Sequence, residues 1–351
     1  MAIPNKIFDC IIIGGGQAGL SVAYFLKRSK LNYLILDAEG NSGGSWLHTW
    51  DSLKLFSPSQ YSSLSGWQMP ESKNEYPCRQ EFIDYLKAYE KRYNFSIQRN
   101  TKVTKVKNKD GIFKIETNQG NFYAETVVSA TGTAKNPFIP SFPKRKDYQG
   151  VQLHSVDYRN TKKFKGKKIL VIGGGNSGAQ ILAELSKVAQ TKWVTLEEPT
   201  FLPEEIDGRY LFQQANSSYF NEKKQTEEKE VSLSDIVQVE IVKNGLKRNI
   251  YDALRPFDSF YKDGVIWQDG EKETFDAVIW CTGFNANLKH LNPLGIIKNG
   301  HIETKNTRSI KYPKLWLVGY GNWTGFASAT IYGVGKTARN TAKEIKAHFD
   351  V

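Results

Sequence analysis

Two glycine-rich turns carry the residues whose spacing points most directly to chemistry. Each has the pattern G-x-G-x-x-G and follows an apolar run, at residues 14–19 and at residues 173–178. In a strand–turn–helix unit, the first glycine allows the tight turn, the second lets a pyrophosphate approach the backbone, and the third lets helix and strand pack closely. The N–H groups at the helix start then hold the anion. Two such units predict two bound dinucleotides and hydride transfer between them.

An acidic residue stands where a ribose is expected to bind in the first unit. Asp37 closes a predicted strand about 20 residues beyond the first glycine, the place where a carboxylate accepts hydrogen bonds from a ribose diol. Glu39 is the second candidate for this role. A purely structural interpretation, in which Asp37 caps a turn at the end of the strand, also fits the pattern.

The elements that must position these residues repeat in outline. The first half reads as strand 7–13, helix 17–29 and strand 33–37, and it closes with a buried strand at 125–129 before Ala130-Thr131-Gly132. The second half reads as strand 168–172, helix 176–187 and strand 191–196, and it closes with strand 275–280 before Cys281-Thr282-Gly283. We therefore expect an α/β fold with two Rossmann-like dinucleotide-binding domains.

Other segments connect these halves. A helix is predicted over 79–93, and short alternating runs within 95–128 indicate an antiparallel ribbon. Residues 47–78 form a long irregular stretch whose aromatic side chains either line a pocket or anchor the core. The polar stretch 216–230 reads as an exposed insertion. A last strand at 314–319, a glycine-rich turn and a helix at 328–348 either dock as plain structure or face a flavin, with Asn322 reaching its ribityl chain.

Composition excludes several classes of protein. The chain has 351 residues and a net charge of +12, without a nucleic-acid motif or an apolar run long enough to span a bilayer. Its three cysteines form no C-x-x-C pair, which argues against a disulfide framework, a zinc site and a dithiol redox centre. We expect a cytoplasmic enzyme with no metal, no nucleic-acid partner and no membrane partner, whose basic surface attracts phosphorylated dinucleotides.

A third motif carries a family resemblance. The segment from Tyr148 through Gly150 and His154 to Tyr158 is similar to the F-x-G-x-x-x-H-x-x-x-[WY] fingerprint of class B flavin monooxygenases, with Tyr in place of the first Phe. The segment 43–46 resembles the G-G-x-W flavin contact of that family, and 176–178 resembles its second glycine motif. The chain as a whole resembles the small bacterial flavin-containing monooxygenases.

The resemblance implies a glutathione-reductase-like architecture in which an NAD(P)H domain (156–284) is inserted into a discontinuous FAD domain (1–155 and 285–351). It also implies a homodimer. The residues expected to contact the cofactors in the discontinuous FAD domain are Gly14, Gly16, Gln17, Ala18, Gly19, Asp37, Gly44, Ser45, Trp46, Val103, Thr131, Gly132, Asn322 and Thr324. Those in the inserted NAD(P)H domain are Gly173, Gly175, Asn176, Ser177, Gly178, Glu197, Cys281 and Thr282. His154 is expected to be a satisfied hinge histidine rather than an acid or base.

The implied reaction is oxygenation of a small molecule. NAD(P)H reduces FAD, and the reduced flavin reacts with O₂ to give a C4a-(hydro)peroxide that oxygenates a soft nucleophile such as a thioether or an amine. The pocket wall is expected to include Trp46, Phe56, Ser57, Gln60 and Trp323, and the catalytic candidates among them are Phe56, Ser57, Gln60 and Trp323.

Two departures from the family pattern shape these expectations. Larger relatives have an Asn near the flavin after G-G-x-W, whereas residues 55–60 contain none, so Gln60 or Ser57 is the candidate substitute. NADPH-selective relatives have an Arg after the second strand of the nucleotide domain. Here Glu197 and Glu198 follow that strand, and carboxylates repel a 2′-phosphate. This predicts a preference for NADH, or at least loose discrimination.

Three other functions compete with oxygenation. The first is an uncoupled NAD(P)H oxidase or flavin reductase that releases H₂O₂. The second is a thioredoxin-reductase-like enzyme, which the lack of a dithiol disfavours. The third is a nucleotide-sensing module without turnover.

Overall fold

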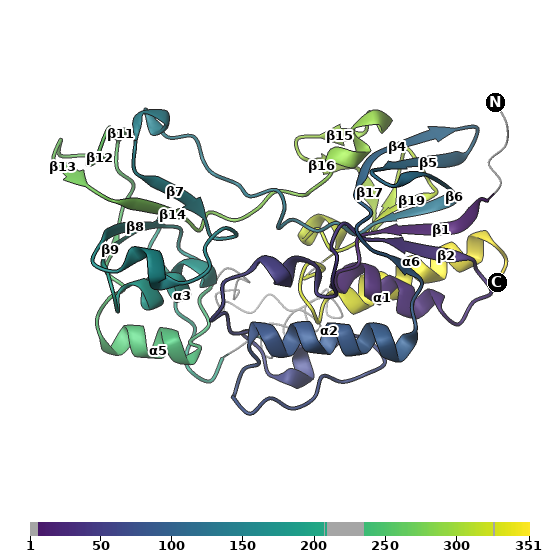
Figure 1. Ribbon diagram of the computed structural model, residues 1–351, viewed down its shortest axis with the longest axis horizontal. Coiled ribbons are helices and arrows are strands. Elements are labelled where there is room, and N and C mark those ends of the chain that lie inside the picture. The colour runs from purple at the N-terminus through teal and green to yellow at the C-terminus, as the bar shows by residue number, and fades with distance from the viewer. Residues whose placement is uncertain (1–5, 207, 209–234, 326) are drawn as a thin grey trace, which may run out of the picture. The chain divides into compact units, whose positions relative to one another are not determined.

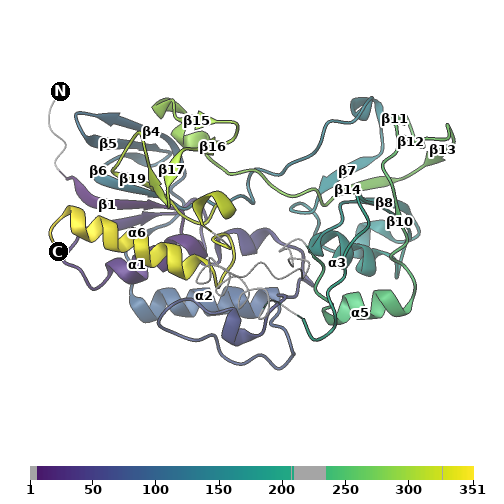
Figure 2. The same cartoon turned by 180° about the vertical axis from the view of Figure 1, so that it is seen from behind.

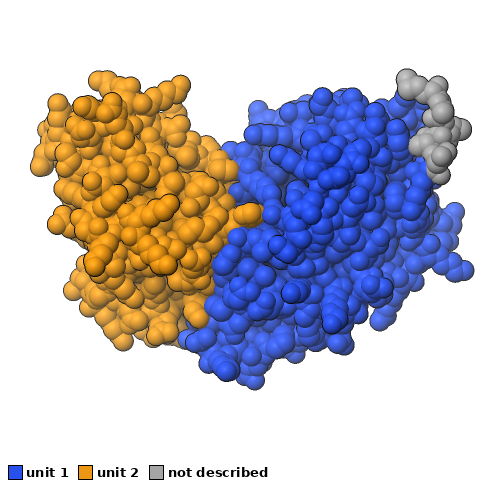
Figure 3. Space-filling view, in the orientation of Figure 1, with its two compact units in different colours: residues 1–47, 58–136, 285–351 blue, residues 48–57, 137–284 orange. Residues whose placement is uncertain are grey.

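The computed structural model describes residues 6–206, 208, 235–325 and 327–351. The chain divides into two compact units, coloured separately in Figure 3. Unit 1 comprises Met1–Leu47, Pro58–Asn136 and Asn285–Val351, and unit 2 comprises His48–Ser57 and Pro137–Phe284. The polar stretch 216–230 lies outside the described residues.

Apolar strands build the central sheet of unit 1. Its strand order is β17-β18-β19-β6-β1-β2-β3, and the five strands from β19 to β3 run parallel. The strands are β1 (Phe8–Ile13), β2 (Tyr33–Leu36), β3 (Ile97–Gln98), β6 (Gly120–Ser129), β17 (Thr304–Lys305), β18 (Arg308–Ser309) and β19 (Leu315–Leu317). A ribbon of β4 (Val103–Lys109) and β5 (Ile112–Thr117) joins this sheet through β6, and β15 (Ile297–Lys298) pairs with β16 (His301–Ile302).

Alternating side chains give this sheet two buried faces. Ile11, Ile13 and Val127 pack with the β4–β5 ribbon and the short helix η5 (Lys289–Leu294). Helices α1 (Gln17–Leu26) and α6 (Val334–His348) lie side by side along the other face (Figures 1 and 2). Helix α2 (Arg79–Tyr93) and the short helices η1 (Gly44–His48), η2 (Ser59–Tyr61) and η6 (Asn322–Thr324) complete the unit.

Unit 2 repeats this plan on a smaller scale. Its sheet is wholly parallel in the order β10-β9-β8-β14-β7. These strands are β7 (Val151–His154), β8 (Lys168–Ile172), β9 (Gln190–Val194), β10 (Ala253–Leu254) and β14 (Ala277–Trp280). Around them lie α3 (Asn176–Leu185), α5 (Glu240–Lys247), η3 (Arg145–Asp147), η4 (Thr161–Phe164) and an antiparallel sheet of β11 (Ser259–Tyr261), β12 (Gly264–Ile266) and β13 (Lys272–Thr274).

Some boundaries differ from the sequence prediction. The strand predicted at 125–129 and the last of the alternating runs before it form one strand, β6, because its first half pairs with β5 and its second half pairs with β1. The last helix begins at Val334 instead of near 328, since the Ser328 hydroxyl bonds back to Gly321 O in a turn. Strand Val151–His154 belongs to unit 2, because it pairs with Ala277–Trp280.

No helix among the described residues is both long and apolar enough to cross a membrane.

The aromatic residues of the stretch 47–78 have mixed roles. Trp50 and Tyr76 are buried core residues, whereas Tyr61 and Trp67 are partly exposed.

Candidate dinucleotide-binding sites

The first glycine turn of unit 1 has the geometry that its spacing predicts. Gly14 has φ +107°, and a Cβ there would lie 2.5 Å from Ala130 O at the end of β6. A Cβ on Gly19 would fall inside 3.0 Å of Gly14 O, so α1 packs on β1 only with glycine at this position. Helix α1 follows Gly16 without a side-chain cap. Its first N–H groups are therefore available to an anion.

Unit 2 reproduces these close approaches. Gly173 has φ +125°, and its Cβ would clash with Cys281 O, while a Cβ on Gly178 would clash with Gly173 O. Helix α3 follows Gly175, again without a side-chain cap. Each unit thus offers a cradle that a Cβ would fill and a helix N-terminus without a side-chain cap, which fits a pyrophosphate in both places.

The G-G-x-W turn lies directly against the first glycine turn. Gly44 is buried with φ +53°, and a Cβ there would lie 2.8 Å from Gly16 Cα. Trp46 Nε1 donates to Gln17 Oε1 at 3.0 Å, and Gln17 Nε2 donates to Ala329 O at 2.9 Å. Ser45 is exposed, and Ala18 is buried against Gly319. Expected flavin contacts from two separate segments, the glycine turn and the G-G-x-W turn, therefore meet at the start of α1.

Asp37 is buried at the end of β2 and already has partners in the chain. Its carboxylate pairs with Arg99 and accepts the N–H of Gly15. Burial raises its pKa, an effect that the Arg99 guanidinium opposes. Glu39 pairs with Lys135. Sequence reasoning missed Arg99, because nothing near β2 shows that β3 delivers an arginine there.

A chain of buried hydroxyl groups underlies the turn that follows β6. Ser129 Oγ lies 2.9 Å from His290 Nε2 and 2.5 Å from Tyr320 Oη. Tyr320 Oη also lies 2.8 Å from Thr131 Oγ1, which donates to Asn287 O at 2.7 Å. These contacts tie the turn at residues 131–132 to the end of β19 and to η5. This network was not predicted, since its members are far apart along the chain.

The direction of the hydrogen bonds in this network follows from its last acceptor. A carbonyl only accepts, so Thr131 donates to Asn287 O and Tyr320 must donate to Thr131. Ser129 then donates to Tyr320, and His290 Nε2–H donates to Ser129. Burial lowers the pKa of His290 to about 4, so its ring is neutral near neutral pH. The neutral ring therefore carries its proton on Nε2.

The remaining expected contacts of unit 1 are spread over several environments. Trp323 is partly buried and stacks on Tyr320 with 5.6 Å between ring centroids. Asn322 is exposed. Thr324 is fully buried, and its hydroxyl donates to Gly321 O at 3.0 Å, so it stabilises the loop. Val103 is partly buried at the start of β4.

In unit 2, most of the expected contacts gather at the carboxyl end of the sheet. The Asn176 amide donates to Asp235 O and accepts from Val237 N, both at 2.9 Å, so it fixes the neighbouring segment. Ser177 is half-buried in the first turn of α3, and Glu197 is exposed after β9. Thr282 Oγ1 donates to Phe138 O at 2.5 Å.

The expected pocket-wall residues belong to both units. Trp46, Gln60 and Trp323 are part of unit 1, whereas Phe56 and Ser57 are part of unit 2. Segment His48–Ser57 is bound to unit 2 by the hydrogen bonds Asp51 N to Arg159 O (2.9 Å), Ser52 Oγ to Glu184 Oε2 (3.0 Å) and Gly208 N to Phe56 O (2.9 Å). Ser57 is buried, and Gln60 is exposed.

The residues of the fingerprint between Tyr148 and Tyr158 have structural roles. The Tyr148 hydroxyl donates to Phe275 O at 2.7 Å, which uses the extra oxygen that Phe would lack, and a Cβ on Gly150 would strike the Tyr148 ring. His154 is buried, donates from Nε2 to Gly283 O at 3.0 Å and accepts at Nδ1 from Val156 N. Burial lowers the pKa of His154, so it is a neutral, satisfied histidine.

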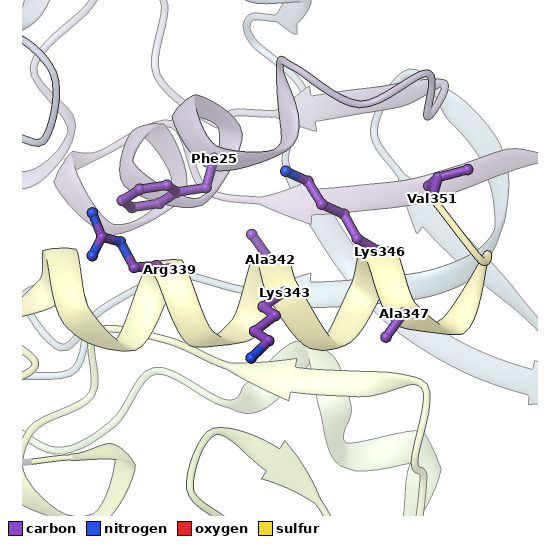
Figure 4. Close-up of a pocket in the computed structure, with 7 residues that line it drawn as sticks. All are labelled: Phe25, Arg339, Ala342, Lys343, Lys346, Ala347 and Val351. Atoms are coloured by element: carbon purple, nitrogen blue, oxygen red, sulfur yellow. The ribbon is translucent and has the colours of Figure 1, made fainter.

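Figure 4 shows a pocket of about 330 Å³ along α6 in unit 1. It is lined by Phe25, Arg339, Ala342, Lys343, Lys346, Ala347 and Val351, none of which is an expected site residue. In the part of the chain that is described, no cluster of three or more histidine, cysteine, aspartate or glutamate side chains is arranged to hold a metal ion.

Comparisons with known proteins agree with this geometry. Residues 11–319 match the model of the pyridine nucleotide-disulphide oxidoreductase family. The flavin-containing monooxygenase from Stenotrophomonas maltophilia is 41% identical, with a TM-score of 0.90 over 98% of this chain and 99% of that one. An uncharacterized CzcO-like oxidoreductase of Geobacillus kaustophilus is 31% identical over 98% of this chain and 100% of its own length.

Two more distant relatives are also similar over most of the chain. The probable indole-3-pyruvate monooxygenase YUCCA1 of Arabidopsis thaliana is 25% identical over 95% of this chain and 89% of its own length. The bacillithiol disulfide reductase of Staphylococcus aureus, at 18% identity and a TM-score of 0.74, shares the fold. The expected fold class, FAD dependence and family are confirmed. The chain belongs to the pyridine nucleotide-disulphide oxidoreductase family and, within it, to the flavin-containing monooxygenases, FAD-dependent oxidoreductases that use NADPH and O₂ to oxygenate small molecules.

Proposed function

We propose that unit 1 holds FAD, that unit 2 holds the nicotinamide nucleotide, and that the enzyme oxygenates a soft nucleophile such as a thioether or an amine. The observation that carries this assignment is the pair of matched glycine cradles, of which only that of unit 1 has the G-G-x-W turn packed against it. Bound FAD supplies hydride acceptance and O₂ activation. The enzyme is further proposed to be a cytoplasmic homodimer.

The residues of unit 1 would hold FAD in three ways. The uncapped start of α1 would bind the pyrophosphate, and Asp37, kept in place by Arg99, would accept from the ribose. Gln17 and Trp46 would fix the approach of the G-G-x-W turn to the same helix end. Each of these groups is positioned by the chain itself, so binding orders few side chains.

The substrate proposal rests on the polarity of the expected pocket wall. None of the five residues expected in the wall carries a charge, since Phe56, Trp46 and Trp323 are aromatic and Ser57 and Gln60 are neutral. Such surroundings exclude water and protons from an activated oxygen species and favour a neutral, polarisable substrate. Glu197 and Glu198 beyond β9 support acceptance of NADH alongside NADPH, or a preference for NADH.

The alternative function is an NAD(P)H oxidase that releases H₂O₂. The specific observation in its favour is the absence of Asn between residues 55 and 60, where larger relatives place one near the flavin. A coupling measurement separates the two functions. The purified enzyme is supplied with NADH or NADPH, O₂ and an aryl methyl sulfide, and sulfoxide and H₂O₂ are both quantified against nucleotide consumed.

The proposal expects sulfoxide to account for most of the nucleotide oxidised. Stoichiometric H₂O₂ with thioethers and amines alike would replace it with the oxidase function. For the nucleotide preference, kcat/KM is compared for NADH and NADPH. A value for NADPH well above the value for NADH would contradict the preference for NADH.

A further inference from the structure

An arginine from a neighbouring strand lies beside the acidic residues that follow β9. Strand β10 pairs in parallel with β9, with Leu254 opposite Val194, so Arg255 emerges next to Thr195. Arg255 Nη1 donates to Thr195 Oγ1 at 2.7 Å and to Glu197 O at 3.1 Å. Arg255 Nη2 pairs with the carboxylate of Glu198. The guanidinium is therefore fixed at the carboxyl end of β9.

This is the place in a dinucleotide-binding fold where the 2′ position of the adenosine ribose is read. A carboxylate there accepts from a 2′-hydroxyl, and an arginine nearby accommodates a 2′-phosphate. Unit 2 offers both kinds of group, and its glycine cradle fits the adjoining pyrophosphate. The two acidic residues are visible in the sequence after β9. Arg255 is visible only in the fold, because it lies far along the chain from them.

The exposure of the Arg255–Glu198 ion pair determines how easily a phosphate displaces Glu198. The Glu198 side chain is 77% exposed and that of Arg255 is 40% exposed. An ion pair this exposed is weak, because water screens both charges. A phosphate carries more charge than a carboxylate and offers two oxygens to the planar guanidinium. It can therefore displace Glu198, while the bonds to Thr195 keep the guanidinium in place.

We propose that Arg255 is the residue that recognises the 2′-phosphate of NADPH, and that Glu198 is its internal competitor. The pairing rests on the proposed function of unit 2 as the nicotinamide nucleotide domain. With NADH, Arg255 stays paired with Glu198, which leaves Glu197 and the backbone to meet the ribose hydroxyls. With NADPH, the 2′-phosphate takes the place of Glu198. One site thus accepts both nucleotides, and the balance is set by how strongly Glu198 competes.

The test measures binding of two adenosine fragments to the FAD-loaded, full-length enzyme by calorimetry. Adenosine 2′,5′-bisphosphate carries the 2′-phosphate, and adenosine 5′-monophosphate lacks it. Arg255→Gln is expected to weaken binding of the bisphosphate roughly tenfold or more and to leave that of the monophosphate unchanged. Glu198→Gln is expected to strengthen bisphosphate binding by up to about fivefold.

Arg248→Gln is the matched control. It removes the same charge from unit 2, but Arg248 donates to Ala183 O and Ser186 Oγ at the C-terminal end of α3, whereas the glycine turn precedes the N-terminal end. Arg248→Gln is expected to leave the affinities for the bisphosphate and the monophosphate unchanged, apart from the small effect of removing one positive charge from unit 2. Arg255→Lys, which keeps the charge, is expected to recover part of the bisphosphate affinity. It also serves as the second variant if Arg255→Gln fails to fold by circular dichroism.

The outcomes separate this inference from the proposed function. Equal weakening of both fragments by Arg255→Gln, or no weakening of either, overturns the role of Arg255 while unit 2 remains the nucleotide domain. Unchanged bisphosphate affinity in Glu198→Gln overturns the role of Glu198 as competitor. If the wild-type enzyme binds neither fragment, the assignment of unit 2 itself fails, and this inference fails with it.

Discussion

Acidification is predicted to destabilise unit 1 through His290. Burial lowers the pKa of the folded residue from 6.5 to about 4, so the unfolded chain binds the proton more tightly than the folded chain does. The stability supplied by neutral His290 is complete above the unfolded pKa and is lost as the pH falls towards the folded pKa. Protonation at Nδ1 would place a positive charge on this buried ring, while Nε2–H continues to donate to Ser129.

The size of this effect follows from linkage. Each unit of difference in pKa corresponds to about 1.4 kcal/mol, so lowering the pH from about 7.5 to about 5 removes roughly 2 kcal/mol through this group. The assay is urea-induced unfolding followed by tryptophan fluorescence at both pH values. His290→Gln keeps a side-chain N–H but does not titrate in this range. It is expected to lose roughly 2 kcal/mol less than the wild type over the same interval.

The exposed His301 provides the control, since His301→Gln removes an imidazole outside the network and is expected to retain the wild-type loss. If His290→Gln shows the same pH dependence as the wild type, the reasoning about a buried neutral histidine is refuted. His154 has a lowered pKa as well, and it contributes equally to all three proteins.

Two further predictions concern the G-G-x-W turn. Gly44→Ala combines a positive φ with a Cβ 2.8 Å from Gly16 Cα, so it should lower the thermal midpoint and weaken FAD binding. Gly111→Ala, with φ +84° and open space around the Cβ, should cost only about 1–3 kcal/mol of strain and leave FAD binding unchanged. Equal effects of the two substitutions on FAD affinity would refute the close approach. Trp46→Phe removes the bond to Gln17 and is expected to cost about 1 kcal/mol in FAD binding by fluorescence titration; an unchanged affinity would argue against that bond.

Elements that depend only on a short stretch of the chain were predictable from the sequence. Helix α2 was predicted over its observed span, Arg79–Tyr93, because its apolar residues recur at helical spacing. The two glycine turns were also predictable, because each needs only a strand, three glycines and a helix in order. The small-Thr-Gly turns were paired correctly, and Ala130 and Cys281 accept equivalent approaches of Gly14 and Gly173.

Features that depend on contacts between distant segments were not predictable. Arg99 reaches Asp37 from β3, and Arg255 reaches Glu198 from β10, because parallel strands place their carboxyl ends together whatever their separation in sequence. The hydroxyl network of Ser129 has the same origin. The start of α6 was predicted six residues too early, because the Ser328 hydroxyl bonds Gly321 O in a turn that precedes the helix.

The central claim is that one chain holds FAD and a nicotinamide nucleotide and passes hydride between them. The most direct measurement mixes the purified, FAD-loaded protein with NADH or NADPH without O₂ and follows the flavin absorbance. We predict bleaching at a rate that saturates with nucleotide concentration, and recovery of the absorbance when O₂ is admitted. A polypeptide that stays colourless after reconstitution with FAD, or a bound flavin that neither nucleotide reduces, would contradict the claim.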